Sequence, residues 1–223
     1  MPRSSSPAFI EPMTAKLVEA LPEGEQWIYE VKFDGYRALL LKDGGHVQIR
    51  SRNDNNLTAT YPTITAAASR LKADTALLDG EIVALDAEGR PSFQALQHRS
   101  AHRGYAIVFY AFDLLHLNGE TITRLPLEAR RQRLPDVVKG SGILLSEPLR
   151  GTPAQLIQAV SQLGLEGIDL AAVDPAVVLK SRDEAIAPFQ RIQTGIVLIG
   201  LLCAAAAALG VFWTIRSAAP TTT

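Results

Sequence analysis

The 223-residue chain is almost balanced in charge, with 22 lysines and arginines against 23 aspartates and glutamates. This balance excludes a basic field over the whole protein, so any contact with nucleic acid must come from local patches. Cys203 is the single cysteine, which excludes a disulfide framework or a cysteine-based metal site and agrees with a reducing compartment. The polar N-terminal residues predict no signal peptide.

The first informative element is a predicted strand over residues 27–32, which are rich in aromatic and β-branched types. The alternation of side chains along a strand places Ile28, Glu30 and Lys32 on one face. A turn at Asp34-Gly35 follows, so Lys32 is expected at a strand end beside a sharp bend. Apolar neighbours and other cations there would lower the pKa of the lysine amine and make it a nucleophile at neutral pH.

The segment from Glu30 to Arg37, Glu-Val-Lys-Phe-Asp-Gly-Tyr-Arg, resembles the adenylation motif of the covalent nucleotidyltransferases. That superfamily includes ATP-dependent DNA ligases, RNA ligases and mRNA capping enzymes. The resemblance implies that Lys32 takes AMP from ATP as a phosphoramidate. It also implies that Glu30 reads the adenine and that Arg37 lies near the ribose and the nucleic-acid phosphate. Without the longer motif, Lys32 would be read as a solvated lysine at a strand end.

Residues 36–42 and 46–51 are predicted to form two strands joined by a Gly-Gly turn. The next residues, Ser-Arg-Asn, resemble the ligase element whose arginine contacts the nucleotide ribose or a DNA phosphate, and this implies such a role for Arg52. An alanine-rich amphipathic helix is expected over residues 61–72.

A strand over residues 77–85 carries Asp79 and Glu81 on the same face, where two carboxylates suit Mg²⁺ and nucleotide oxygens. The sequence Leu-Leu-Asp-Gly-Glu resembles the ligase motif whose glutamate binds the ribose and helps position the metal, which implies both roles for Glu81. A further strand is expected over residues 105–117. It contains Ala-Phe-Asp-Leu-Leu-His-Leu-Asn-Gly, similar to the ligase element whose aromatic residue stacks on adenine, here Phe112.

Helices are predicted over residues 126–134 and 152–163, with a strand over residues 143–149 between them. Up to the end of these elements, the resemblance to bacterial end-joining DNA ligases is nearly continuous.

The resemblance breaks at the next motif, Glu-Gly-hydrophobic-x-x-Lys. Glu166 matches its glutamate, which implies a role toward the metal or sugar, but Asp169 stands where an apolar residue is expected and Ala171 holds the place of the lysine. A missing cation weakens the stabilisation of charge in phosphoryl transfer. The last family motif has no clear match, and Lys180 is the one residue that stands in for a lysine that grips the α-phosphate.

Residues 194–215 form an uncharged run that as a helix would span roughly 33 Å, enough to cross a bilayer. The excess of lysine and arginine before this run favours a cytoplasmic domain tethered to the inner face of the plasma membrane. Gly200, Ala204 and Ala208 recur every four residues, a spacing that would let two such helices self-associate. A buried alanine-rich helix, or a tail created by a frame disruption, is the alternative.

The sequence therefore predicts an α+β, ATP-grasp-like nucleotidyltransferase fold of antiparallel sheets with flanking helices. We expect a ligase-type adenylation domain over residues 1–180, a linker over 181–193, the membrane helix over 194–215 and a short tail over 216–223. Between Ile168 and Thr194 there are too few residues for the five-stranded barrel that follows this domain in a full ligase.

The resemblance implies ATP and Mg²⁺ as cofactors and nicked DNA with a 5′-phosphate end as the partner, in DNA repair and recombination. Two alternatives stay open. One is a catalytically degenerate, membrane-tethered module that binds nucleotide or nucleic acid. The other is capping or RNA-ligase chemistry within the same superfamily.

Overall fold

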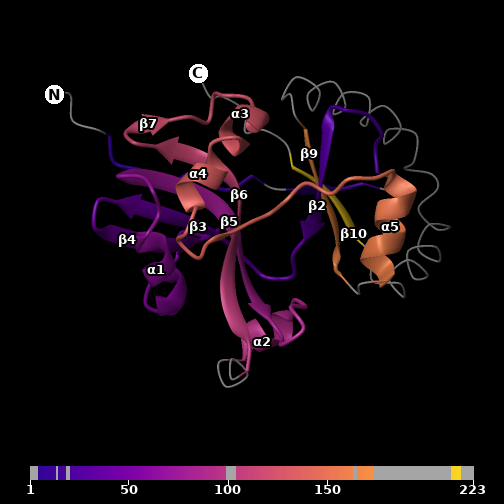
Figure 1. The fold of residues 1–223 in the computed structure, drawn as a ribbon, viewed down its shortest axis with the longest axis horizontal. Coiled ribbons are helices and arrows are strands. Elements are labelled where there is room, and N and C mark those ends of the chain that lie inside the picture. The colour runs from indigo at the N-terminus through magenta and orange to yellow at the C-terminus, as the bar shows by residue number, and fades with distance from the viewer. Residues whose placement is uncertain are drawn as a thin grey trace, which may run out of the picture. The chain divides into compact units, whose positions relative to one another are not determined.

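A computed structural model describes residues 5–13, 15–18, 21–98, 104–162, 165–172 and 212–216. The described residues form two compact units, each with a sheet of its own (Figure 1). Unit 1 comprises residues 1–12 and 33–147, and unit 2 comprises residues 13–32 and 148–223. The chain passes from unit 2 to unit 1 directly after Lys32.

Unit 1 is built on a six-stranded sheet. Its strands are β3 (Tyr36–Asp43), β4 (His46–Ser51), β5 (Thr75–Leu85), β6 (Ala106–Leu117), β7 (Glu120–Thr121) and β8 (Leu144–Leu145). The strand order is β4-β3-β5-β6-β7, and β8 pairs with β6 in parallel. The four long strands agree with the ranges predicted from the sequence, whereas the expected strand over 143–149 is reduced to the two residues of β8.

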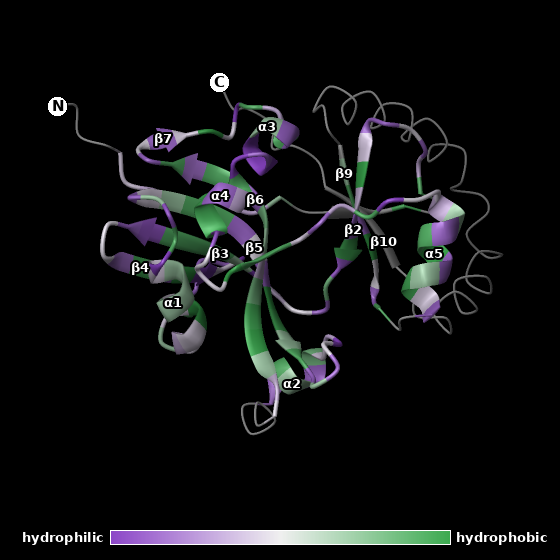
Figure 2. Ribbon diagram, viewed as in Figure 1, coloured by the Kyte–Doolittle hydropathy of each residue, from purple (hydrophilic) through white to green (hydrophobic). Residues whose placement is uncertain are grey.

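The main core of unit 1 lies between this sheet and the helices on one of its faces. These helices are α1 (Pro62–Ser69), α2 (Phe93–Gln97) and α4 (Leu134–Val138), and α3 (Leu127–Arg131) precedes α4. Hydrophobic residues run along β5 and β6 and over the inner sides of α1 and α2 (Figure 2). The predicted amphipathic helix corresponds to α1, on which Ile64 and Ala68 are both buried.

The predicted helix over 126–134 is instead two short helices, α3 and α4. Pro135 lies at the first turn of α4. A proline has no amide hydrogen and clashes with the preceding turn of a helix, so the chain must begin a new helix there.

Unit 2 is built on a four-stranded sheet in the order β1-β10-β9-β2. Its strands are β1 (Ala15–Leu17), β2 (Trp27–Lys32), β9 (Gly167–Ala172) and β10 (Phe212–Arg216). The sheet is mixed, because β10 runs parallel to β9 while the other pairs are antiparallel. With the parallel pairing of β8, this corrects the expectation of purely antiparallel sheets.

Helix α5 (Pro153–Gln162) packs on the sheet of unit 2, where Leu156 and Val160 share a core with Ile168 and Leu170 (Figure 1). Its N-terminus is capped by Thr152 and Gln155. The amide of Gln155 donates to Thr152 Oγ1 at 3.4 Å, and the amide of Thr152 donates to Gln155 Oε1 at 2.9 Å. This reciprocal pair satisfies amides that the first helical turn leaves without a helical partner.

The predicted membrane helix over 194–215 is corrected in part. Its last four residues belong to β10, and residues 194–211 lie outside the described residues, as does the self-association stripe. Among the helices of the described segments, none has the length and apolar character needed to cross a membrane.

Candidate nucleotide site

The predicted nucleophile, Lys32, is the last residue of β2, as the sequence indicated. Alternation along this strand sends Trp27 and Tyr29 into the core of unit 2 and leaves Glu30 and Lys32 on the opposite face. Glu30 is only 1% exposed. The side chain of Lys32 is 22% exposed, so the amine stays within reach of a ligand.

The Lys32 ammonium donates a hydrogen bond to Glu166 and forms an ion pair with it. Glu166 directly precedes β9, and β9 pairs antiparallel with β2, with Lys32 opposite Gly167. The register of these two strands therefore brings together two residues that the sequence predicted independently. Cationic neighbours were expected around the amine, but at this contact its neighbour is the carboxylate of Glu166. A carboxylate favours the charged form of a lysine, whereas a cation would disfavour it.

The two residues that break the family motif, Asp169 and Ala171, lie on the same face as Lys32. In the register of β2 and β9, Asp169 is opposite Glu30 and Ala171 is opposite Ile28. Ala171 is 5% exposed, so its methyl group fills a buried position where a lysine was expected. Asp169 is 8% exposed and places a second carboxylate beside Glu30. Lys180 lies outside the described residues.

In unit 1, Arg37 is held by Asp79 and Phe112. Arg37 donates from Nε and Nη2 to the two carboxylate oxygens of Asp79, each at 2.6 Å. Its guanidinium carbon lies 4.3 Å from the centroid of the Phe112 ring. A bidentate pair with a cation–π contact fixes the plane of a guanidinium. Phe112 is 2% exposed. Its role in stacking on adenine stays a prediction.

Glu81 is opposite Arg37 in the pairing of β3 with β5, two positions from Asp79. The unbroken β3–β5 register supports the prediction that Asp79 and Glu81 share a face. The sequence assigned Asp79 to a metal-binding pair, whereas the structure uses it as the partner of Arg37. No spacing in the sequence could reveal this contact, because it depends on which strands pair and in what register.

Two glycines let the chain approach closely around Glu81. A Cβ on Gly35 would clash with the carbonyl oxygen of Ile82 and with the Glu81 side chain. A Cβ on Gly80 would clash with the ring of Phe109. Glycine is therefore needed at both positions because neighbouring atoms leave no room for a Cβ. Backbone conformation is not the reason, since neither glycine has a positive φ.

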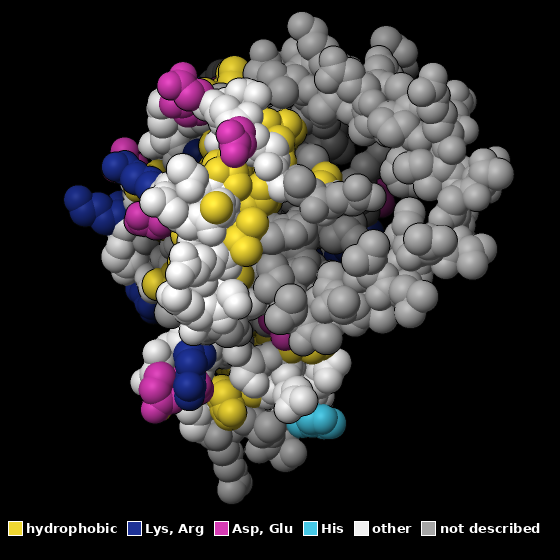
Figure 3. Space-filling view, turned by 90° about the vertical axis from the view of Figure 1, so that its right-hand side faces the viewer, with side chains coloured by type: hydrophobic (Ala, Val, Ile, Leu, Met, Phe, Trp, Pro, Cys, Tyr) yellow, Lys and Arg dark blue, Asp and Glu magenta, His cyan; other side chains and the backbone are white. Residues whose placement is uncertain are grey.

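Arg52 lies on the loop after β4, and its side chain is exposed. Its amide donates to the carbonyl oxygen of Arg37 at 3.2 Å, which places the two predicted phosphate-contacting arginines at one end of the unit 1 sheet. On the face drawn in Figure 3, the described basic and acidic side chains lie beside one another around a hydrophobic stretch. The described part of this face therefore carries no extended field of one charge sign.

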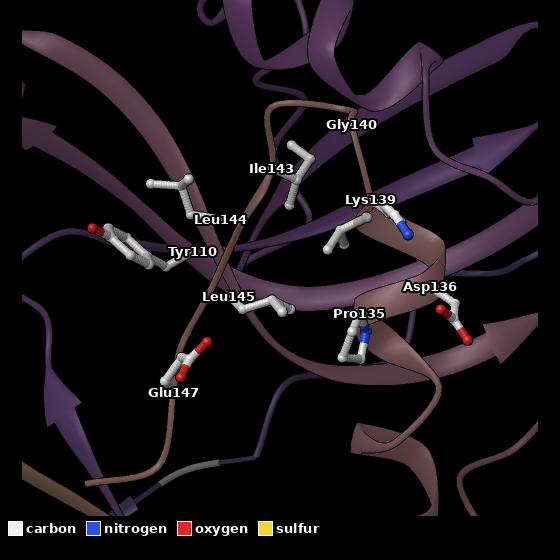
Figure 4. A pocket seen from close by; sticks show the side chains of 10 residues that line it. Tyr110, Pro135, Asp136, Lys139, Gly140, Ile143, Leu144, Leu145 and Glu147 are labelled. Atoms are coloured by element: carbon white, nitrogen blue, oxygen red, sulfur yellow. The ribbon is translucent and has the colours of Figure 1, made fainter.

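A shallow pocket of about 620 Å³ on unit 1 lies between α4 and β8 (Figure 4). Tyr110 and Leu144 line one side, and Asp136 of α4 and Lys139, which directly follows α4, line the other. Burial raises the pKa of Tyr110, whose ring stacks on Phe33 with centroids 4.1 Å apart. None of the predicted site residues lines this pocket.

Arg130 and Asp113 form a buried ion pair that no motif in the sequence indicates. Arg130 donates to both carboxylate oxygens of Asp113, at 2.9 and 2.7 Å, and to the carbonyl oxygen of Leu125 at 2.6 Å. Asp113 is 5% and Arg130 9% exposed. A buried pair with this many bonds fixes α3 against β6 and serves the fold.

Comparison with known proteins supports the family suggested by these motifs. Residues 11–168 match the family model described as ATP dependent DNA ligase domain. The multifunctional non-homologous end joining protein LigD of Pseudomonas aeruginosa is 39% identical over 170 residues, which cover 74% of this chain and 20% of that protein. DNA ligase C of Mycobacterium tuberculosis is 33% identical over 194 residues, covering 82% of this chain and 53% of that protein.

Among solved structures, mycobacterial DNA ligase D complexed with ATP and MES is similar with a TM-score of 0.65 and 36% identity, over 73% of this chain and 54% of that one. The ligase domain of M. tuberculosis LigD gives a TM-score of 0.59 at 37% identity, over 67% of this chain and 49% of that one. The chain thus spans about a fifth of the LigD relative and about half of DNA ligase C.

Proposed function

The chain belongs to the ATP-dependent DNA ligase domain family, and from that premise we propose that it carries out the adenylation step of an end-joining DNA ligase. The observation that carries this proposal is the contact of Lys32 with Glu166 across β2 and β9. Lys32 and Glu166 belong to separate family motifs, and both lie within the residues that match the family model. They are in contact at the end of β2, where the side chain of Lys32 is partly exposed.

In the proposed reaction the neutral amine of Lys32 attacks the α-phosphorus of ATP. A bond forms between Nζ and phosphorus, the bond from phosphorus to the bridging oxygen breaks, pyrophosphate leaves, and the amine releases its proton to solvent. AMP then passes from Lys32 to the 5′-phosphate of nicked DNA, and the adjacent 3′-hydroxyl displaces it to seal the nick. Nicked DNA as substrate is part of this proposal.

The remaining predicted residues would bind the nucleotide. Glu30 would read the base from its buried position beside Lys32, whereas Arg37 and Arg52 would meet the ribose or phosphates. Phe112 would supply the stacking surface for adenine, and Lys180 would grip the α-phosphate. The support for these roles is their match to the family motifs within residues 11–168, which excludes Lys180.

Mg²⁺ is part of this proposal, because the family motifs imply Glu81 and Glu166 as its carboxylates. The described residues contain no group of three or more acidic, histidine or cysteine side chains suited to a metal. Single carboxylates still fit Mg²⁺, which in nucleotide sites takes one or two carboxylates and completes its shell with phosphates and water. The ion would neutralise charge on the phosphates.

The test is incubation of the purified chain with Mg²⁺ and ATP labelled at the α-phosphate. We expect label that survives denaturation and is absent from Lys32→Ala. Equal labelling of that variant would remove Lys32 from the mechanism.

A second candidate function is nucleotide binding without catalysis. Ala171 on β9 favours it, because the cation expected beside the phosphates is absent at that position. Thermal stabilisation by ATP without covalent label would support this second function, and Lys32-dependent label would contradict it.

We also propose, from the uncharged run alone, that residues 194–215 tether the domain to the inner face of the plasma membrane. In the structure, residues 212–216 form β10 between β1 and β9. A membrane helix over residues 194–215 would include residues 212–215, which are strand residues of β10, so the two arrangements exclude each other. Retention in the membrane fraction after alkaline carbonate washing supports the tether, and release into the supernatant supports β10.

A further inference from the structure

The residues that follow the predicted nucleophile connect β2 to β3. β2 ends at Lys32 and β3 begins at Tyr36, so residues 33–35 lie between the two strands. Phe33 is the first residue of unit 1 after the chain leaves unit 2, and one peptide bond joins it to Lys32. Any contact that holds Phe33 in place therefore also restrains the backbone of the nucleophile.

The ring of Phe33 stacks on the ring of Tyr110 in β6. The two centroids are 4.1 Å apart and the ring planes differ by 16°, so the faces of the rings are in contact. Both residues belong to unit 1. A stacked aromatic pair stabilises its arrangement beyond what burial alone provides. The stack thus attaches the residue after Lys32 to one position of the unit 1 sheet.

Tyr110 is a firm partner because β6 has a paired strand on each side at this residue. Tyr110 is opposite Glu81 of β5 and is paired with Leu144 of β8. Across β5, Glu81 is opposite Arg37 of β3. Residues opposite one another in antiparallel strands lie on the same face of a sheet, so Arg37, Glu81 and Tyr110 share a face. Phe33 is therefore stacked beside two of the residues predicted to bind the nucleotide.

The rest of the bend is also close to the unit 1 sheet. A Cβ on Gly35 would clash with the carbonyl oxygen of Ile82 in β5, and Arg37 is bound to Asp79 through two hydrogen bonds. The attachment at Phe33 differs from the close approach at Gly35 because it is a contact between two side chains. A substitution of either ring removes it and leaves the backbone of the bend intact.

We propose that Phe33 and Tyr110 are a positioning pair, which fixes the residue next to Lys32 so that the amine meets the α-phosphorus of ATP. Both rings act through Lys32, and neither contacts the nucleotide in this proposal. The inference rests on the proposed function, because it takes Lys32 as the nucleophile. A misplacement of about 1 Å can slow a reaction by about a hundredfold. Loss of the stack should therefore slow the transfer of AMP more than it weakens the binding of ATP.

The experiment measures the rate of AMP labelling in a single turnover over a range of ATP concentrations. The maximal rate and the half-saturating ATP concentration are then obtained separately. Tyr110→Leu and Phe33→Leu each remove one ring, the double variant removes both, and Tyr110→Phe keeps the stack. Tyr105→Leu is the matched control, because it removes another partly buried tyrosine directly before β6.

We expect Tyr110→Leu and Phe33→Leu each to lower the maximal rate by about tenfold or more, with the half-saturating concentration within about twofold of wild type. The double variant should be no slower than the single ones, since either substitution already removes the stack. Tyr110→Phe and Tyr105→Leu should match wild type. A raised half-saturating concentration at an unchanged maximal rate would overturn the inference, because the rings would then bind the nucleotide. An unchanged maximal rate in Tyr110→Leu, or an equal loss in Tyr110→Phe, would also overturn it.

Hydrogen exchange followed by mass spectrometry tests the same pair without catalysis. In Tyr110→Leu the amides of residues 31–37 should exchange about tenfold faster than in wild type, whereas Tyr105→Leu should leave them unchanged. Unchanged exchange in Tyr110→Leu, or faster exchange throughout the chain, would contradict a positioning role. Failure of the proposed function is separate, because the wild-type chain would then take no label or Lys32→Ala would retain it.

Discussion

Lys32 and Glu166 lie 134 positions apart in the chain, yet the Lys32 ammonium is ion-paired with the Glu166 carboxylate. The contact joins the end of β2 to the start of β9 within one sheet. It holds the amine against a carboxylate, so Lys32 must leave Glu166 before its neutral amine can act as a nucleophile.

Glu166→Gln should therefore affect the chemistry more than the fold. The pair is partly exposed, with 22% and 27% of the two side chains accessible, so its loss should change the free energy of unfolding by no more than about 1 kcal/mol. We expect AMP labelling to fall by about tenfold or more, because the variant loses a carboxylate proposed for Mg²⁺. Urea unfolding and labelling rates measure the two effects. A variant that labels at the wild-type rate would remove Glu166 from the site, and Glu25→Gln serves as the control.

Arg130→Met should destabilise the protein strongly. It leaves the buried Asp113 carboxylate without its bidentate partner, which typically costs about 3–5 kcal/mol of unfolding free energy. Arg133→Met, at an exposed neighbouring position, should change stability by less than about 0.5 kcal/mol. Urea denaturation of both variants checks the difference, and similar values would contradict the role of the buried pair.

Burial raises the pKa of Asp113 against the opposing effect of Arg130. A carboxyl whose pKa is raised in the folded state binds its proton more tightly there, so its contribution to stability declines as pH rises from the ordinary aspartate range through the raised pKa. The decrease in unfolding free energy caused by Arg130→Met should therefore be smaller at acidic pH, where Asp113 is neutral. Unfolding curves of both proteins at several pH values test this, and a constant difference would contradict it.

His116 should make the fold sensitive to mild acid. It is 1% exposed, and its Nε2 accepts a hydrogen bond from the amide of Gly119 at 3.2 Å. Burial lowers the pKa of His116. Because the unfolded chain takes up a proton at higher pH than the folded one, stability should fall as pH drops below about 6.5 toward the lowered pKa. In His116→Gln the unfolding free energy should no longer show this decrease with falling pH. In His46→Gln, which changes an exposed histidine, the decrease should remain.

Gly35→Ala tests the close approach of the Asp-Gly bend to β5. The added methyl group would clash with the Ile82 carbonyl oxygen, so we expect a loss of about 1–3 kcal/mol in unfolding free energy. Gly45→Ala is the control, since a Cβ there meets no atom within 4 Å. Equal unfolding midpoints for the two variants would show that the bend relaxes without cost.

Local elements were predictable from the sequence because they depend on local chemistry. The strand over residues 27–32 was obtained with its bounds, since alternation and β-branched residues specify it without reference to any partner. The predicted helix over 126–134 was too long at its C-terminal end, since α3 ends at Arg131 and a new helix with Pro135 in its first turn begins at Leu134.

The partners of these elements were not predictable in the same way. β2 and β3 are adjacent in sequence, yet β2 pairs with β9 and β3 pairs with β4 and β5. The contact of Arg37 with Asp79 and the opposition of Glu30 and Asp169 both follow from strand register, which many distant residues decide together. The resemblance to family motifs identified most of the candidate site residues. The strand register determines which of their charged side chains lie close together.

The most direct test of the account is to locate AMP on the chain. The protein is incubated with Mg²⁺ and ATP labelled at the α-phosphate, digested, and its labelled peptide sequenced by mass spectrometry, beside Lys32→Ala and the exposed-lysine control Lys72→Ala. We expect one labelled peptide with AMP on Lys32, absent from Lys32→Ala and unchanged in Lys72→Ala. AMP on another residue, or an unchanged yield from Lys32→Ala, would contradict it.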